Sequence, residues 1–153
     1  MHEPPPNQDV LPPERLRWLT SWLLHHASSH ANRLVAAHAG RPGFRMRYAL
    51  LAGLDQYGSL SQAELCRRLG VDRGDAVSAL NDMERDGLAR RLPDPADARR
   101  NVVEITPAGA EALFELDAVV NAAQDELLQR LTKEERGQLN VLLHKLIEPP
   151  EAR

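Results

Sequence analysis

Cysteine, aromatic residues and long apolar runs are all scarce in this chain of 153 residues. The single cysteine, Cys66, excludes an internal disulfide and a zinc site made of four cysteines. Aromatic residues make up 4% of the sequence, which disfavours sandwiches and barrels of many short strands and favours a mainly helical chain. No apolar run approaches the roughly 20 residues of a membrane span, and the N-terminus lacks the basic start and hydrophobic stretch of a secretory signal. We therefore expect a cytoplasmic protein with no membrane partner.

The residue types of catalytic and metal sites are thinly spread. An enzyme needs a nucleophile beside a base, or a metal with its activated water, but the serines and histidines are scattered along predicted helices. His26 and His30 stand four apart, as two zinc ligands could, yet no nearby cysteine or carboxylate completes the set. Cys66, between Leu65 and Leu69, is expected to be a small buried residue rather than a redox-sensing thiol. We expect no enzyme activity, no catalytic residue, no metal and no cofactor.

Charge is divided unevenly along the chain. The net charge of −3 argues against a nucleic-acid partner, because phosphate-binding proteins usually carry a basic surface. Residues 41–100, however, hold 11 arginines against 9 acidic residues, while the remainder holds 8 basic against 13 acidic residues. The middle of the chain is therefore the better candidate for contact with phosphate.

Apolar spacing predicts two helices before the middle of the chain. Residues 1–13 contain five prolines and are expected to be disordered. Apolar and histidine side chains recur every three or four positions over residues 14–39, which predicts one amphipathic helix that ends within residues 40–43. A second, largely apolar helix is predicted over residues 44–57, with Gly58 after its last turn.

Two short helices in the middle of the chain have the spacing of a helix-turn-helix. Ser61 is expected to cap the first, with Glu64 reaching back to the Ser61 amide as in a capping box. Gly70 ends this helix, and Asp72 caps the next one, residues 73–86, after a turn of about three or four residues. The side chains of the second helix that are expected to face inward are Ala76, Ala79, Leu80 and Met83.

The repeat then shortens from that of a helix to that of a strand. Side chains alternate over residues 88–92 and 102–105, which predicts two strands joined by a charged loop over residues 93–101. A hairpin that follows a helix-turn-helix and carries basic residues at its tip is the winged form of that motif. We therefore expect a winged helix-turn-helix.

Two long helices are predicted after the hairpin. Thr106 caps the first, with Pro107 in the first helical position, and its apolar stripe continues to about Leu131. Thr132 and Glu135 form a capping box that opens the last helix. The apolar stripes of these terminal helices exceed what the winged unit, the small part of the chain over residues 44–106, can cover. A second copy of the chain is the simplest partner for them.

A resemblance to a known family lies in the segment LGVDRGDAVSALNDMERDGLARRLPDPADARRNVVEITPAG, which is similar to the MarR family of bacterial transcriptional regulators. The motif positions that match are Asp97 and Arg99 in the wing, then Ile105, Thr106 and Gly109 at the start of the following helix. The likeness spans about residues 14–147. It implies a winged-helix homodimer that responds to small molecules, with the first, fifth and sixth helices at the dimer interface.

The expected fold is therefore mainly α, a winged helix-turn-helix with a two-stranded wing and additional N- and C-terminal dimerisation helices. Its expected parts are a disordered segment (1–13), a dimerisation helix (14–43), the DNA-binding domain (44–106) and C-terminal dimerisation helices (107–148). The resemblance implies a transcriptional regulator, expected to be a repressor, that binds double-stranded DNA at a pseudo-palindromic operator.

The predicted DNA contacts fall on three parts of the winged unit. A recognition helix fits the major groove and presents its exposed N-terminal residues to base edges. The wing reaches the minor groove, where Arg99 meets concentrated negative potential and Asp97 braces its guanidinium. The start of the first short helix offers hydroxyl and amide groups to phosphate. The predicted DNA-binding residues are Ser61, Gln62, Arg73, Gly74, Val77, Ser78, Asn81, Arg90, Asp97, Arg99 and Arg100.

The predicted recognition helix departs from the family pattern because it is acidic. Asp75 and Asp82 add negative charge to a helix that is usually rich in serine, threonine and arginine in relatives. Either these aspartates are turned toward Arg73 and Arg85, or affinity depends more on the wing and on the pair Arg90–Arg91. The alternative function that this leaves open is a winged-helix protein-interaction module with weak or no DNA binding.

The resemblance also implies a ligand site between the dimer helices and the winged unit, where effectors of the family often bind. The candidate ligand-binding residues are Trp22, His26, Arg47 and Leu51. They offer ring contact, a hydrogen bond and a positive charge to a small anionic aromatic molecule. The same four side chains also suit ordinary core and interface positions.

Overall fold

The computed structural model describes residues 12–40 and 42–148 of the chain. Its elements are, in order, α1 (Glu14–Arg17), α2 (Thr20–Ala39), α3 (Phe44–Tyr57), α4 (Gln62–Leu69), α5 (Arg73–Arg85), β1 (Ala89–Asp94), β2 (Asp97–Ile105), α6 (Pro107–Leu127) and α7 (Lys133–Ile147). Helices dominate, and β1 and β2 form a two-stranded sheet, which confirms the expected winged helix-turn-helix. Most of the segment predicted to be disordered, residues 1–11, lies outside the described residues. None of the described helices is long and apolar enough to cross a membrane.

The winged unit is built around α3. Three leucines of α3, Leu50, Leu51 and Leu54, have at most 1% of their surface exposed. They pack in one cluster with Leu65 of α4, Leu80 and Met83 of α5, and Val103 of β2. Gly53 allows this close approach, because a Cβ there would lie 2.9 Å from a methyl carbon of Leu65. Burial of these side chains, at about 25 cal/mol per Å², is the main favourable contribution to the stability of the unit.

Side-chain caps begin four of the helices, as the sequence predicts. Asp72 accepts hydrogen bonds from the backbone of the first turn of α5, Thr106 does the same for α6, and Thr132 and Glu135 form the full capping box of α7. Ser61 caps α4, but the expected return bond from Glu64 is wrong. The Glu64 carboxylate instead binds two arginines one turn further along, because charged donors bind a carboxylate more strongly than a backbone amide does.

The wing is longer than the sequence pattern predicts. Strands β1 and β2 stay paired from Ala89 opposite Ile105 to Pro93 opposite Asn101, so most of the predicted loop belongs to the strands. Pro93 interrupts the alternating pattern without ending the strand, because a two-stranded sheet has open edges at which a missing N–H costs little. The turn closes where the Asp94 side chain accepts the Ala96 N–H at 2.8 Å.

The predicted helix over residues 14–39 is interrupted once. Leu19 has an extended backbone, with φ −78° and ψ 111°, so α1 is a single turn and α2 begins at Thr20. The apolar spacing continues across this residue, and for that reason the periodicity contains no sign of the break. Similarly, α6 ends at Leu127 instead of near Leu131, since residues 128–130 form a turn that leads into α7.

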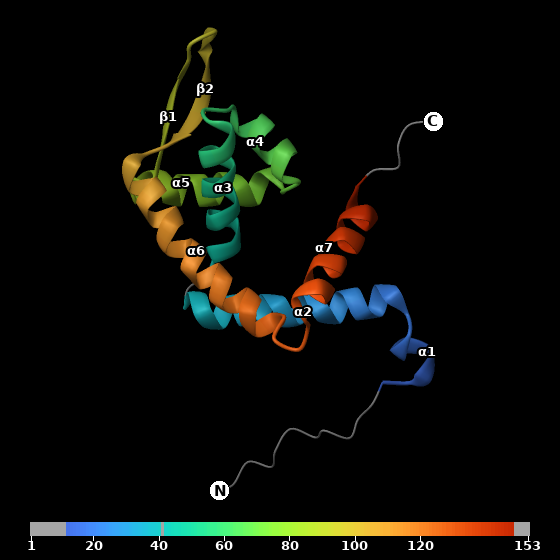
Figure 1. Cartoon of the computed structure of the whole chain (residues 1–153). Helices are drawn as coiled ribbons and strands as arrows, with labels where there is room; N and C mark the ends of the chain where they lie inside the picture. Colours follow the sequence, from blue (N-terminus) through green and yellow to red (C-terminus); the bar gives the residue numbers. More distant parts are fainter. Residues whose placement is uncertain (1–11, 41, 149–153) are drawn as a thin grey trace, which may run out of the picture.

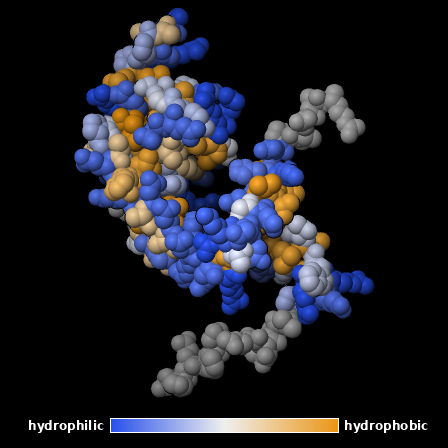
Figure 2. Space-filling view, in the orientation of Figure 1, coloured by the Kyte–Doolittle hydropathy of each residue, from blue (hydrophilic) through white to orange (hydrophobic). Residues whose placement is uncertain are grey.

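The terminal helices lie outside the winged unit. In Figure 1, α6 runs from the base of the wing to α2, which passes beneath the unit, while α7 rises on the far side of a gap. No residue of α2 or α7 is buried. Figure 2 shows apolar side chains exposed over α7 and over the end of α2 nearest α1. This apolar surface has no covering element among the described residues.

Candidate nucleic-acid interface

The recognition helix α5 has a buried side and an exposed side. Ala76, Leu80 and Met83 are fully buried against the rest of the winged unit, which fixes the rotation of the helix. The residues that this rotation exposes include all five predicted base-contacting positions, Arg73, Gly74, Val77, Ser78 and Asn81. They share one face by the 3.6-residue repeat. The fold therefore presents them together at the surface.

A side chain caps the start of each helix of the helix-turn-helix, α4 and α5, and lies at the surface there. Asp72 accepts from the Gly74 N–H at 2.7 Å and from the Asp75 N–H at 3.3 Å. Ser61 accepts from the Glu64 N–H at 3.2 Å, and both Ser61 and Gln62 are partly exposed at the start of α4. A hydroxyl that caps with its oxygen still has its own proton to donate to phosphate.

Asp97 braces two arginines near the tip of the wing. It accepts from Nε of Arg99 at 3.1 Å, and its other carboxylate oxygen lies 3.6 Å from Nε of Arg100. The Arg99 side chain is 91% exposed, so its guanidinium extends beyond the sheet. The geometry matches the predicted arrangement of a pre-oriented cation at the end of a hairpin.

The arginines at the base of the wing are held in ion pairs. Arg90 pairs with Glu104 on the neighbouring strand, and Ser59 donates to the same carboxylate at 3.1 Å. The hydrogen bond from Arg90, then that from Ser59, lowers the pKa of Glu104. Arg91 binds Glu84 and Asn81 of α5. The positive charge at the base of the wing is therefore largely compensated.

The acidic residues of α5 differ in their surroundings. Asp82 pairs with Arg85, which is half of the first arrangement that the sequence left open, in which both aspartates turn toward arginines. Asp75 is exposed, and no ion pair engages it among the described residues. Arg73, at the first position of α5, is likewise exposed. The helix therefore presents both a cation and an anion in its first turn.

Glu64 and Cys66 occupy opposite sides of α4. Glu64 binds Arg67 at 2.6 Å and Arg68 at 2.7 Å, and these hydrogen bonds lower its pKa to about 2. Cys66 is 3% exposed, and burial raises the pKa of its thiol, which confirms the expected small buried residue. Neither residue presents a reactive group to the helix-turn-helix surface.

The four predicted ligand-binding residues do not meet within one chain. Trp22 and His26 contact each other near the start of α2, with ring centroids 4.5 Å apart. Arg47 lies in the first turn of α3, beyond the other end of α2, and pairs with Asp86 at 2.7 Å. Leu51 has 0% of its surface exposed. No group of three or more metal-binding side chains is present in residues 12–40 and 42–148.

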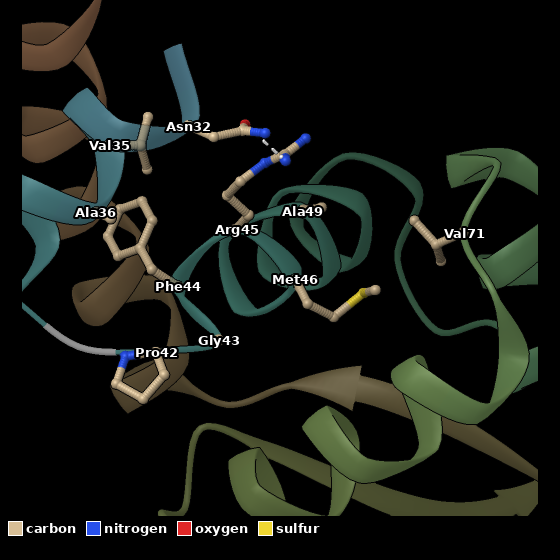
Figure 3. A pocket seen from close by; sticks show the side chains of 10 residues that line it. All are labelled: Asn32, Val35, Ala36, Pro42, Gly43, Phe44, Arg45, Met46, Ala49 and Val71. Carbon is tan, nitrogen blue, oxygen red and sulfur yellow. Dashed lines mark hydrogen bonds between the residues drawn. The ribbon is translucent and has the colours of Figure 1, made fainter. Parts of the chain in front are cut away.

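A cleft lies instead at the junction of α2 and α3 (Figure 3). Its volume is about 500 Å³, and it is mainly apolar. Its lining includes Val35, Ala36, Phe44, Met46, Ala49 and Val71. Arg45, at its edge, donates to the side chain of Asn32 at 2.7 Å. No sequence pattern indicates this cleft, because its walls come from ordinary core-type residues in two helices and a turn.

Comparisons with known proteins agree on one family. The model of the MarR family matches residues 45–100. A Thauera aromatica protein named as a transcriptional regulatory protein for the hcr operon is 34% identical over 116 residues, which cover 76% of this chain and 68% of that protein.

Two solved structures are similar over almost their full length. A probable transcriptional regulator from Pseudomonas aeruginosa has a TM-score of 0.80 and 28% identity, covering 87% of this chain and 100% of that chain. A mutant of MarR from E. coli, complexed with operator DNA, has a TM-score of 0.74 and 25% identity, covering 84% of this chain and 93% of that chain.

Proposed function

Because this chain belongs to the MarR family of transcriptional regulators, we propose that it is a homodimeric repressor of a pseudo-palindromic operator. The observation that carries this proposal is the pairing of an exposed recognition face on α5 with Arg99 at the tip of the wing, braced by Asp97. Residues of α5 read the major groove, Arg99 enters the adjacent minor groove, and Ser61 and Gln62 bind phosphate.

The exposed apolar faces of the terminal helices support the homodimer. The large apolar side chains exposed on these helices or at their ends are Trp18, Leu19, Leu23, Leu24, Phe114, Val141, Leu142, Leu146 and Ile147. An apolar surface of this extent is unusual on a monomer and marks an interface. A second copy presents the same faces, so a two-fold axis lets each cover the other.

A small aromatic acid in the α2–α3 cleft is the proposed effector. Phe44 and Met46 offer apolar contact to a ring, and Arg45 offers a cation at the edge for a carboxylate. The cleft joins a helix outside the winged unit to a helix inside it. Occupation of the cleft therefore affects the orientation of the winged unit relative to α2, and with it the affinity for the operator.

Footprinting and fluorescence anisotropy test the DNA-binding proposal. The probe is duplex DNA from upstream of the protein's own gene, with a scrambled duplex of equal length as the control at one salt concentration. We expect tight binding to the first duplex and two protected half-sites about one helical turn apart. Protection of one half-site alone contradicts the two-fold geometry.

A winged-helix interaction module is the second candidate function. The exposed Asp75 and the ion-paired arginines at the base of the wing favour it, since both reduce the attraction of α5 for phosphate. In the same anisotropy experiment, equal and weak binding to both duplexes at low salt supports the module and contradicts the regulator that reads an operator.

A further inference from the structure

Asn81, Glu84 and Arg91 form a cluster that joins the recognition helix to the wing. Nη2 of Arg91 donates to Oδ1 of Asn81 at 2.9 Å, and Nη1 donates to the Glu84 carboxylate. The Arg91 backbone N–H also donates to Glu84, at 3.2 Å. Three hydrogen bonds therefore connect β1 to two positions of α5 that lie one turn apart. The sequence did not predict these contacts, which link residues seven and ten positions apart.

The chemistry of arginine determines which end of the Asn81 amide faces it. A guanidinium carries five N–H donors and no acceptor, so it binds the oxygen of an amide and never its nitrogen. The oxygen of Asn81 is thus turned toward Arg91. No hydrogen bond among residues 12–40 and 42–148 engages the Nδ2 amino group, and Asn81 is exposed beside Val77 and Ser78. The amide presents its donors, and not its acceptor, to the surface of α5.

Glu84 completes the arrangement by compensating the charge of Arg91. The Arg91 side chain is only 25% exposed, so its guanidinium is partly withdrawn from water. The planar guanidinium of Arg91 forms a fork of two nitrogens: Nη1 donates to the carboxylate of Glu84, and Nη2 donates to the amide oxygen of Asn81. An ammonium group has no such fork, and a lysine cannot hold both acceptors in the same fixed geometry. The orientation of the Asn81 amide therefore depends on arginine in particular.

We propose that Arg91 is a positioning residue that makes Asn81 a donor-only reader of base edges, an inference that rests on the proposed DNA binding. In the major groove, guanine offers the acceptors N7 and O6, and thymine offers O4. Adenine is read by an asparagine that donates and accepts at once. Because the oxygen of Asn81 is turned toward Arg91, it does not face the N6 amino donor of adenine, and adenine is left with N7 as its one acceptor beside that donor. Guanine and thymine offer acceptors without a neighbouring donor, so the donor-only amide favours them over adenine.

The test compares base preferences of variants in the full-length chain. Wild type, Asn81→Ala, Arg91→Met and the double variant each select from a library of randomised duplexes, and the bound DNA is sequenced. We expect wild type to favour guanine or thymine over adenine by about tenfold at one position of each half-site. Both single variants lose this preference at that position alone. The double variant matches Asn81→Ala, because Arg91 acts through Asn81.

Two further variants separate a positioning role from a structural one. Asn81→Asp keeps an acceptor for Arg91 but removes the donors, so the preference shifts toward cytosine, whose major-groove edge is a donor. Arg90→Met is the matched control, because Arg90 is the neighbouring ion-paired arginine of β1 but does not contact Asn81. It leaves the ranking of bases at this position as in wild type, whatever it does to affinity. Circular dichroism verifies that each variant folds.

Three outcomes overturn the inference. Selection of adenine by wild type at every position of the half-site contradicts the donor-only amide. Uniform loss of affinity in Arg91→Met, with the base ranking unchanged, shows that Arg91 merely tethers the wing. Enrichment of no sequence by wild type contradicts the proposed operator binding itself, and the inference with it, whereas the first two outcomes leave operator binding standing.

Discussion

Each of the four arginines of the wing, Arg90, Arg91, Arg99 and Arg100, pairs with a carboxylate. Asp97 lies at the tip of the wing, where it orients Arg99 while leaving that side chain 91% exposed. Glu104 instead pairs with Arg90 across the two strands, and Glu84 of α5 ties Arg91 to the recognition helix, where only 25% of that side chain is exposed. Arginine therefore extends into solvent at the tip of the wing, whereas at its base it links two elements of the fold. Charge counted along the sequence cannot separate these uses, because the partners of Arg90 and Arg91 come from other elements.

Replacement of Arg99 by alanine should weaken operator binding by about 1–3 kcal/mol, because it deletes the proposed minor-groove cation. Asp97→Ala should have a smaller effect in the same direction, since it releases the guanidinium without removing it. Anisotropy titrations at one salt concentration measure both. Tm should stay at the wild-type value because Arg99 makes no buried contact. An Arg99→Ala protein that binds the operator as tightly as wild type shows that the wing makes no such contact.

Acid should weaken the contribution of Glu64 to stability over a defined range. Hydrogen bonds from Arg67 and Arg68 lower its pKa from 4.5 to about 2, so the stabilisation is complete above pH 4.5 and is lost as the pH falls toward 2. The urea midpoint of Glu64→Gln should lie below that of wild type at neutral pH, and the difference should shrink over this range. Glu111→Gln is the control, since Glu111 is exposed and has no arginine hydrogen bond among the described residues. A difference that persists unchanged at the acid end contradicts the assignment.

Helix boundaries show what a sequence can and cannot specify. The caps at Asp72, Thr106 and Thr132 were predictable because each depends on residues within one turn of chain. The break at Leu19 was not, because apolar spacing is the same on both sides of it. The length of the wing was also mispredicted, since pairing across the sheet overrides the turn-like composition of its tip. Hydrogen bonds within one turn of a helix can be predicted from the sequence, whereas contacts between helices and strands must be observed in the structure.

The start of α6 depends on the absence of a side chain at Gly109. A Cβ there would lie 2.0 Å from the backbone oxygen of Leu88 and 2.8 Å from a side-chain carbon of Ile105. Gly109→Ala should therefore destabilise the fold by about 1–3 kcal/mol or more, because a backbone atom cannot move aside as a flexible side chain can. Urea denaturation measures the change. Ala110→Gly, at the next and exposed position, is the control and should cost about 1 kcal/mol of helix propensity. An equal loss in the two variants contradicts the steric argument.

Over residues 12–40 and 42–148, the side chains of the winged unit are well buried and those of the terminal helices are poorly buried. α7 contains no buried residue, although Leu142 and Leu146 are both apolar and are 58% and 62% exposed. The sequence already predicted this excess from the stripes of the terminal helices. It could not predict the α2–α3 cleft or the cluster at Arg91, since both depend on how distant segments meet.

The paired substitution Leu142→Glu and Leu146→Glu should dissociate the proposed dimer, because it places charge where apolar surface is expected to meet apolar surface. Sedimentation at micromolar concentration should give a dimer for wild type and a folded monomer for the variant. Asn140→Glu with His144→Glu adds the same side chains at polar, exposed positions of α7 and should stay dimeric. A wild-type chain that sediments as a folded monomer refutes the homodimer.

The close packing at Gly109 makes α6 a lever. Its N-terminal end is locked to the winged unit through Leu88 and Ile105, and its C-terminal end reaches α2, where Glu126 accepts from His38 at 2.8 Å. At 1.5 Å per residue, its 21 residues span about 30 Å. A tilt of about 6° at one end therefore carries the other through about 3 Å, close to the rise of one base pair. On the proposed operator binding, a tilt of this size moves the winged unit along the duplex by about one base pair, which is enough to put two recognition helices out of register with their half-sites.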